Sequence, residues 1–274
     1  MGLRVNTNIA SLTAQRNLNT VSSRLGGNYT RLSSGLRIAT AADDAAGLAI
    51  SERMRSQIRS YGAASRNAQD GISLVQTAEG ALNESSNILS RMRELAIQAS
   101  NGTLSTDDRD TINLEVTALI DELDRISSST EFNAIPLLDG SSTTTSIQVG
   151  LSAGETIDIS LADTTASTLG VNTVDVTTAT NANNALSAID DAIDNVNSTR
   201  GALGAAQNRL TSAYTSILNA RENLSAAESR IRDVDVAAET ADLTRNSIMQ
   251  QAAVSVLQQA NVQPQIALSL LQGR

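Results

Sequence analysis

Residues 246–273 read NSIMQQAAVSVLQQANVQPQIALSLLQG and contain no charged residue. On a helical wheel the apolar side chains of this stretch spread over much of the circumference, and such a helix must be enclosed on most sides. Lipid is a poor enclosure, because each of the seven Gln amides would need hydrogen-bond partners that hydrocarbon lacks. We therefore expect no membrane insertion and a helix that is buried by other protein.

The composition excludes most catalytic and metal chemistry. The 274 residues include no Cys, His or Lys, and all twenty basic residues are Arg. The sequence therefore offers no thiol or imidazole for catalysis, no Schiff-base lysine and no Cys or His ligand for zinc. The cluster of Asp107, Asp108 and Asp110 is more typical of a helix cap than of a cation site. We expect no enzymatic activity, no metal and no cofactor.

The net charge of −9 is distributed unevenly along the chain. Residues 1–66 hold nine Arg and three acidic residues, whereas residues 67–199 hold four Arg and twenty acidic residues. A basic segment can indicate nucleic-acid binding, but the Lys clusters and interleaved aromatic residues of such surfaces are missing from this sequence. We expect no nucleic acid, and expect the basic start to contact the acidic middle in the same molecule or a neighbouring copy.

Heptad spacing predicts two very long helices, at about residues 45–99 and from residue 186 to about residue 231. The first seam includes Ala68, Ile72, Val75, Glu79, Leu82, Ser86 and Leu89. The second seam includes Leu186, Ile189, Ile193, Val196, Leu203, Gln207 and Leu210. At 1.5 Å per residue the helices would be about 80 and 70 Å long. Two matching seams predict an antiparallel hairpin of long helices.

Shorter elements accompany these helices. The apolar spacing over residues 3–36 predicts an N-terminal helix that Gly35 ends. Ser105 is expected to cap a further helix that runs to about residue 126. Alternating apolar and polar residues at 146–150 and 156–161 predict a β-hairpin. Residues 162–181 are rich in Thr, Ser and Asp and favour an exposed loop or weak strands.

Together these patterns predict a mainly α fold. It is a long antiparallel helical rod or coiled-coil bundle with a small β-hairpin, plus a terminal two-helix coiled coil. Two helices cannot cover residues 243–271 on all sides, so we expect the termini to order only on assembly with other copies. A surface that repeats head-to-tail without closing a ring gives a helical filament.

Several long segments are similar to bacterial flagellin. They are RVNTNIASLTAQRNL (4–18), RLSSGLRIATAADDAAGLAIS (31–51), RMRELAIQASNG (91–102), EFNAIPLLDG (131–140) and the two parts of 222–261, ENLSAAESRIRDVDVA and LTRNSIMQQAAVSVLQQAN. The resemblance covers about residues 1–140 and 182–272, and it identifies the chain as a member of that family with reduced outer domains.

The resemblance implies five parts. These are an N-terminal helix of an inner, channel-lining domain (1–42), the N-terminal helices of a rod domain (43–140), a hairpin with a reduced variable region (141–181), the C-terminal helix of the rod domain (182–232) and the C-terminal helix of the inner domain (233–274).

The resemblance also implies function and partners. The chain would be a structural subunit that polymerises head-to-tail into the flagellar filament for motility, secreted by type III export and extracellular. Its partners would be copies of itself, the filament cap protein, the hook–filament junction protein and an export chaperone that binds the C-terminal helix. Two alternatives are a hook–filament junction or minor flagellin-like protein and, from another class, a cytoplasmic coiled-coil adaptor.

Two sets of residues are candidate sites. The apolar positions of the terminal helices are expected at a subunit interface: Leu18, Val21, Leu25, Leu32, Leu243, Ile248, Ala252, Val256, Leu257, Ile266 and Leu270. The resemblance implies contacts with the vertebrate flagellin-sensing Toll-like receptor at Arg91, Leu95 and Glu115, and packing within the filament is the alternative role for them. Ser90 stands where many recognised flagellins have Gln, which weakens the receptor inference.

Overall fold

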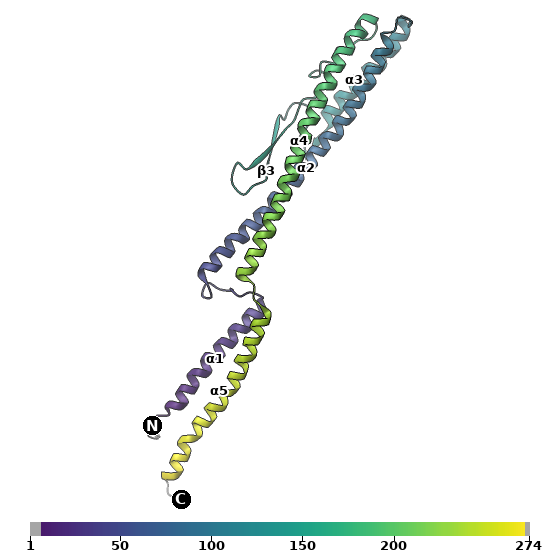
Figure 1. The fold of residues 1–274 in the computed structure, drawn as a ribbon. Helices are drawn as coiled ribbons and strands as arrows, with labels where there is room; N and C mark the ends of the chain where they lie inside the picture. Colours follow the sequence, from purple (N-terminus) through teal and green to yellow (C-terminus); the bar gives the residue numbers. More distant parts are fainter. Residues whose placement is uncertain (1–6, 272–274) are drawn as a thin grey trace. The chain divides into compact units, whose positions relative to one another are not determined.

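The computed structural model describes residues 7–271, without the side chains of residue 265 and of residues 267–271. Within that range it contains five helices and two small antiparallel sheets (Figure 1). The chain divides into two compact units, one of residues 1–56 with 223–274 and one of residues 57–222. The mainly α fold class expected from the sequence is confirmed.

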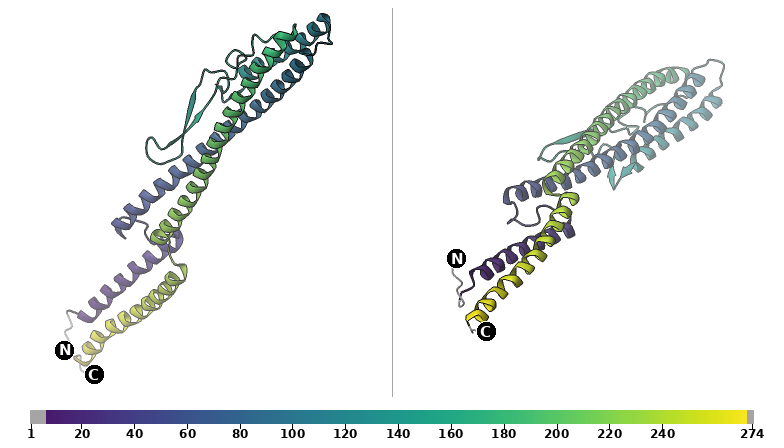
Figure 2. Two further views of the ribbon diagram at one scale, coloured as in Figure 1. Left: turned by 45° about the horizontal axis from the view of Figure 1, so that its top comes forward. Right: turned by 60° about the horizontal axis from the view of Figure 1, so that its bottom comes forward.

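The first unit contains the two terminal helices, α1 (Ile9–Ser34) and α5 (Val236–Leu271). Asn8 caps the start of α1 by accepting a hydrogen bond from the Ser11 amide. Gly35 ends α1 as predicted, because it adopts the left-handed conformation (φ 72°) and donates its amide to the Arg31 carbonyl. Both views of Figure 2 show α1 and α5 side by side, in purple and yellow.

The second unit is built on α2 (Ala45–Ala99), α3 (Thr106–Ser129) and α4 (Ala179–Arg232), of which α2 and α4 extend into the first unit. Gly71 of α2 lies against Leu210 of α4, and Arg93 pairs with Asp190, so the two long helices are antiparallel. Helix α3 begins with a capping box in which Ser105 and Asp108 each accept the other's backbone amide, as the sequence predicted for this helix start.

Both long seams differ from their predicted registers at every second position. The seam positions with the larger side chains are buried as predicted. They are Val75, Leu82 and Leu89 in α2 and Ile189, Val196 and Leu203 in α4. The intervening buried positions are one residue earlier and carry small side chains. They are Gly71, Ala78 and Ser85 in α2 and Ala185, Ala192 and Ala206 in α4. Small residues let the helices approach closely, so Ile72, Glu79 and Ile193 are displaced to the edge of the seam.

Two hairpins join α3 to α4. The two-residue strands β1 (Glu131–Phe132) and β2 (Ile135–Pro136) pair across Asn133 and Ala134, which both have positive φ; the sequence analysis did not predict these strands. The predicted hairpin is present as β3 (Thr144–Gln148) and β4 (Thr156–Ser160), with Ile147 opposite Ile157.

The segment between β4 and α4 corrects the expectation of an exposed loop or weak strands. It contains no strand within its described residues, and it packs into the core of the second unit. Ala166, Val171 and Val176 have no exposed surface, although Thr, Ser and Asp surround them. Several polar residues of the segment form local hydrogen bonds, for example Asp175 with Thr177 and Asn181, so its few apolar residues are free to point inward.

Candidate assembly interface

The two terminal helices contact each other along one side only. Six of the predicted interface residues lie half-buried along this α1–α5 seam: Leu18, Val21, Leu25, Leu32, Leu243 and Leu257. Their remaining exposure follows from geometry, because one partner helix covers only part of another helix's circumference. These leucines and this valine therefore hold the two terminal helices of one chain together.

Several of the most deeply buried side chains of the seam are polar. Asn28 donates its side-chain amide to Glu239 at 2.6 Å, and Asn246 donates its amide to the oxygen of Asn28 at 2.8 Å. The exposed fractions of these three residues are 6–8%. Near the other end of the pair, Ser11 donates its hydroxyl to Asn261 at 2.7 Å.

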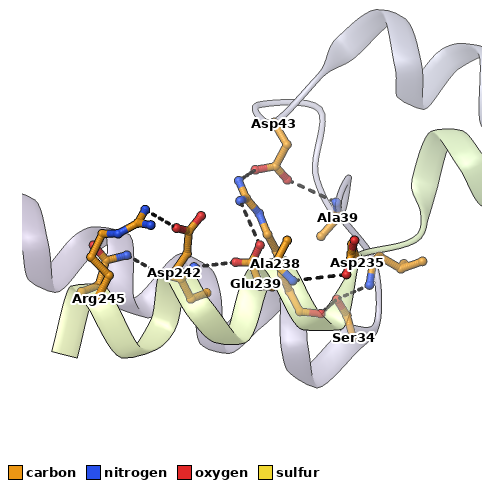
Figure 3. A network of polar contacts seen from close by, with 12 residues as sticks. Ser34, Ala39, Asp43, Asp235, Ala238, Glu239, Asp242 and Arg245 are labelled. Carbon is orange, nitrogen blue, oxygen red and sulfur yellow. Dashed lines mark hydrogen bonds and ion pairs between the residues drawn. The ribbon is translucent and has the colours of Figure 1, made fainter. Parts of the chain in front are cut away.

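Charged groups extend this network at one end of the seam. Arg31 lies 3.8 Å from Glu239 and 4.0 Å from Asp43, and Figure 3 shows Asp43 of the connector and Glu239 of α5 on either side of a guanidinium group. Asp43 also accepts the amides of Ala39 and Thr40, and the hydrogen bonds from Thr40 lower its pKa. The network therefore joins α1, α5 and the connector between α1 and α2.

The outward side of α5 is apolar and uncovered. Ile248, Ala252 and Val256 follow one another in steps of four and so lie along one side of the helix. Ile248 is 61% exposed and Val256 59% exposed. A row of this kind, without a charged residue after Arg245 in the described part of the helix, is typical of a protein-binding surface.

Comparisons with known proteins agree on one family. Residues 5–143 match the model of the bacterial flagellin N-terminal helical region, and residues 186–271 match that of the bacterial flagellin C-terminal helical region. The flagellin of Halalkalibacterium halodurans is 49% identical over 97% of this chain and 99% of its own length. The flagellin of Bacillus subtilis is 46% identical over 98% of this chain and 100% of its own.

The chain belongs to the bacterial flagellin family.

Membership in the flagellin family makes this chain a structural subunit of the flagellar filament, which serves motility, and not an enzyme. The crystal structure of Bacillus cereus flagellin is similar, with a TM-score of 0.51 and 35% identity over 56% of this chain and 88% of that one. A flagellar hook-associated protein of Vibrio parahaemolyticus shares the fold over 70% of this chain and all of its own (TM-score 0.56), but at 18% identity. None of these comparisons favours the junction-protein or adaptor alternatives.

The predicted flagellin interface residues thus fall into two groups. Ile248, Ala252, Val256 and Ile266 are exposed, whereas the six residues named above are half-buried within the chain. The side chain of Leu270 lies outside the described residues.

The structure adds exposed apolar residues that the sequence prediction missed. Ile9 and Leu12 are 61% and 56% exposed on α1, and Val262 is also exposed on α5. Ile9 and Leu12 were missed because the prediction for α1 followed a single seam. The sequence pattern that could have identified them is the presence of apolar residues outside that seam.

The three residues predicted to contact the receptor differ in their exposure to solvent. Arg91 donates to Glu115 at 2.8 Å and to Glu94 at 3.1 Å, and both partners are exposed; the hydrogen bond to Glu115 is the main cause of the raised pKa of Arg91. Leu95 is only 2% exposed and lies in the core of the second unit. It therefore supports the surface from beneath, whereas Arg91 and Glu115 are available to a partner.

Neither a membrane span nor a metal centre is found in the part of the chain that the structure describes. No described helix combines the length and hydropathy that crossing a bilayer requires. No three or more acidic side chains there gather as a cation site, and Asp108 serves the capping box of α3.

Proposed function

We propose that the outward apolar row of α5 is the subunit contact through which this chain polymerises head-to-tail. The observation that supports it is a contrast between two sides of α5. The side toward α1 is covered and its buried polar groups are hydrogen-bonded, whereas the uncharged row of Ile248, Ala252 and Val256 is exposed. Burial of apolar surface contributes about 25 cal/mol per Å² only when something covers it, and sister copies supply that cover.

The experiment replaces Ile248 and Val256 with Glu in the full chain. Each substitution would place a charge in the proposed dry contact, so filaments should not form, while the helical signal of the second unit should persist. Sedimentation and negative-stain microscopy measure assembly, and circular dichroism measures helicity. Ile248→Val is the matched control, because it keeps the site apolar, and it should assemble normally. Normal filaments from the Glu variants would overturn the proposed contact.

The same contact gives a physical reason for the expectation that the terminal helices become ordered when subunits assemble. In a dilute lone subunit only one side of α5 is covered, so its hydrogen bonds should open often compared with those of α2. Amide exchange at residues 240–264 should be fast in the subunit and at least tenfold slower in the filament. Equal protection of these amides in both states would show that assembly does not order the helix.

The five-part division of the chain is part of the proposal. Residues 1–42 and 233–274 would line the channel, residues 43–140 and 182–232 would form the rod, and residues 141–181 the reduced outer part. The polar amides of Gln250, Gln251 and Gln258 suit a wet channel wall that carries no charge. The proposal also includes type III export and an extracellular location. The filament would grow at its tip under the cap protein and would be attached to the hook–filament junction protein.

Two further partners are proposed from exposed surfaces. An export chaperone would cover the apolar row of α5 before assembly, so purified chaperone should bind the full chain and lose affinity for Ile248→Glu. The vertebrate flagellin-sensing Toll-like receptor would meet Arg91 and Glu115. Arg91→Ala should lower activation of receptor-bearing cells by the subunit, and failure of the unaltered subunit to activate them would remove this partner.

A further inference from the structure

The α1–α5 seam contains a register problem that its apolar residues do not solve. Leu18, Leu25 and Leu32 are spaced by seven, and Leu243 and Leu257 by fourteen. A slip of α5 along α1 by one heptad would again place these leucines opposite apolar or neutral residues, because the seam repeats at that interval. The hydrophobic contacts of the pair therefore distinguish the observed register from its neighbours only weakly.

The buried polar residues of the seam do not repeat in this way. Asn28 is the only Asn or Gln among the buried residues of α1, and it contacts both Asn246 and Glu239, which are themselves spaced by seven on α5. A slip of one heptad in one direction would move Asn246 from Asn28 to Val21. A slip in the other direction would move Glu239 away from Asn28 and Arg31. Each slip leaves a buried amide or carboxylate without its hydrogen bond, which is costly.

We propose that Asn28, Asn246 and Glu239 are the residues that set the register of α1 against α5. A buried polar residue at a seam position is a device by which helix pairs specify one alignment at some cost in stability. Here the three side chains satisfy one another only in the observed alignment. Arg31 links Glu239 to Asp43, so the same alignment also holds the connector that leads to α2. The alignment fixes which side of each terminal helix remains exposed for assembly.

This inference rests on the proposed assembly, because the terminal helices are expected to order in the filament. The chain has no Cys, so pairs of introduced Cys residues report alignment without background. Ser11→Cys with Asn261→Cys joins positions whose side chains are 2.7 Å apart in the observed register. Ser11→Cys with Val254→Cys joins positions that meet only after a slip of one heptad. The measurement is the ratio of the two disulfide yields in assembled filaments under a mild oxidant.

With Asn28 and Asn246 intact, the in-register disulfide should exceed the slipped one by about tenfold or more, as the loss of one buried hydrogen bond implies. In the Asn28→Leu, Asn246→Leu background the ratio should fall toward one. If that background does not assemble, Asn246→Ala removes one hydrogen bond without adding bulk and should lower the ratio several-fold. The matched control is Gln259→Leu, which replaces an exposed amide of the same helix, and it should leave the ratio unchanged.

The two proposals fail in different ways. If the unaltered chain forms no filaments, the proposed function is overturned, whatever the disulfides show. If filaments form and the ratio is the same with and without Asn28 and Asn246, the register inference alone is overturned.

Discussion

At the scale of single residues, small side chains decide how closely the long helices approach. A Cβ added at Gly71 would lie 3.1 Å from Cγ1 of Ile147 and 3.3 Å from Cδ1 of Leu210. Both distances are tighter than ordinary contact, so Gly71 lets α2, β3 and α4 meet at one point. Gly80 lies nine residues further along the same helix, and its Cβ would have no neighbour within 4 Å.

We therefore expect opposite effects from the same substitution at these two glycines. Gly71→Leu should destabilise the second unit by about 1–3 kcal/mol, because it overpacks the contact with Ile147 and Leu210. Gly80→Leu should stabilise it by up to about 1 kcal/mol, because leucine favours the helix over glycine. Urea unfolding followed by circular dichroism measures both. A stabilised Gly71→Leu variant would show that the three elements separate easily at this point.

At the scale of elements, the helix ends are set by local chemistry more than by packing. Ser105 accepts the Asp108 amide at 3.2 Å, and Asp108 accepts the Ser105 amide at 3.1 Å. Two amides that the first turn of α3 leaves unpaired are satisfied in this way, and the acidic residues favour the positive end of the helix dipole. Sequence alone locates such an end well, and the start predicted for α3 is confirmed.

Removing the cap gives a prediction for this element. Ser105→Ala should lower the free energy of unfolding of the second unit by about 1 kcal/mol, because the Asp108 amide loses its acceptor. Ser105→Asp keeps an acceptor at the cap and should lose much less. Both are measured by urea unfolding at neutral pH. Equal stability of the Ala variant and the unaltered chain would mean that solvent satisfies the amide as well as the serine does.

At the scale of the whole molecule, carboxylates stabilise both units through hydrogen bonds. Eight carboxyl groups of the described residues have a pKa below their usual value: Asp43, Glu52, Asp108, Glu122, Asp139, Asp163, Asp175 and Asp190. At Asp190 the cause is the hydrogen bond from Arg93 on α2. Several exposed pairs of this kind act together although each contributes little alone.

The sign of these pKa shifts predicts a loss of stability in acid. As the pH falls, the unfolded chain binds protons first, so the contribution is complete above about pH 5 and disappears between about pH 4 and 2. The urea midpoint should therefore be lower at pH 2.5 than at pH 7. Asp190→Asn is the matched control, because its deficit relative to the unaltered chain should shrink at pH 2.5. A midpoint that is unchanged or raised in acid would contradict the prediction.

The sequence predicted many residues of the candidate site, but it did not predict which of them are exposed and which are covered by the chain itself. The uncharged tail predicted that α5 is an assembly element, and the exposure of Ile248 and Val256 is compatible with that proposal. It did not separate these residues from Leu243 and Leu257, which are half-buried against α1. Leu95 likewise matched a receptor motif but is buried. Whether an apolar residue is buried within the chain depends on which element packs against that face of its helix. The sequence pattern is the same whether that neighbour belongs to the same chain or to another copy.

What the sequence determined by itself was the helices and the larger β-hairpin, since heptad spacing, Gly35 and the Ser105 cap act within a few residues of the chain. It determined the family as well, through long motifs. Only the tertiary structure decided the register. In the long helices the seam passes through Gly71 and Ala192, one residue before the larger Ile72 and Ile193, because closeness of approach outweighs side-chain size. Between α1 and α5, Asn28 selects its partners across more than two hundred residues, and no local pattern encodes that contact.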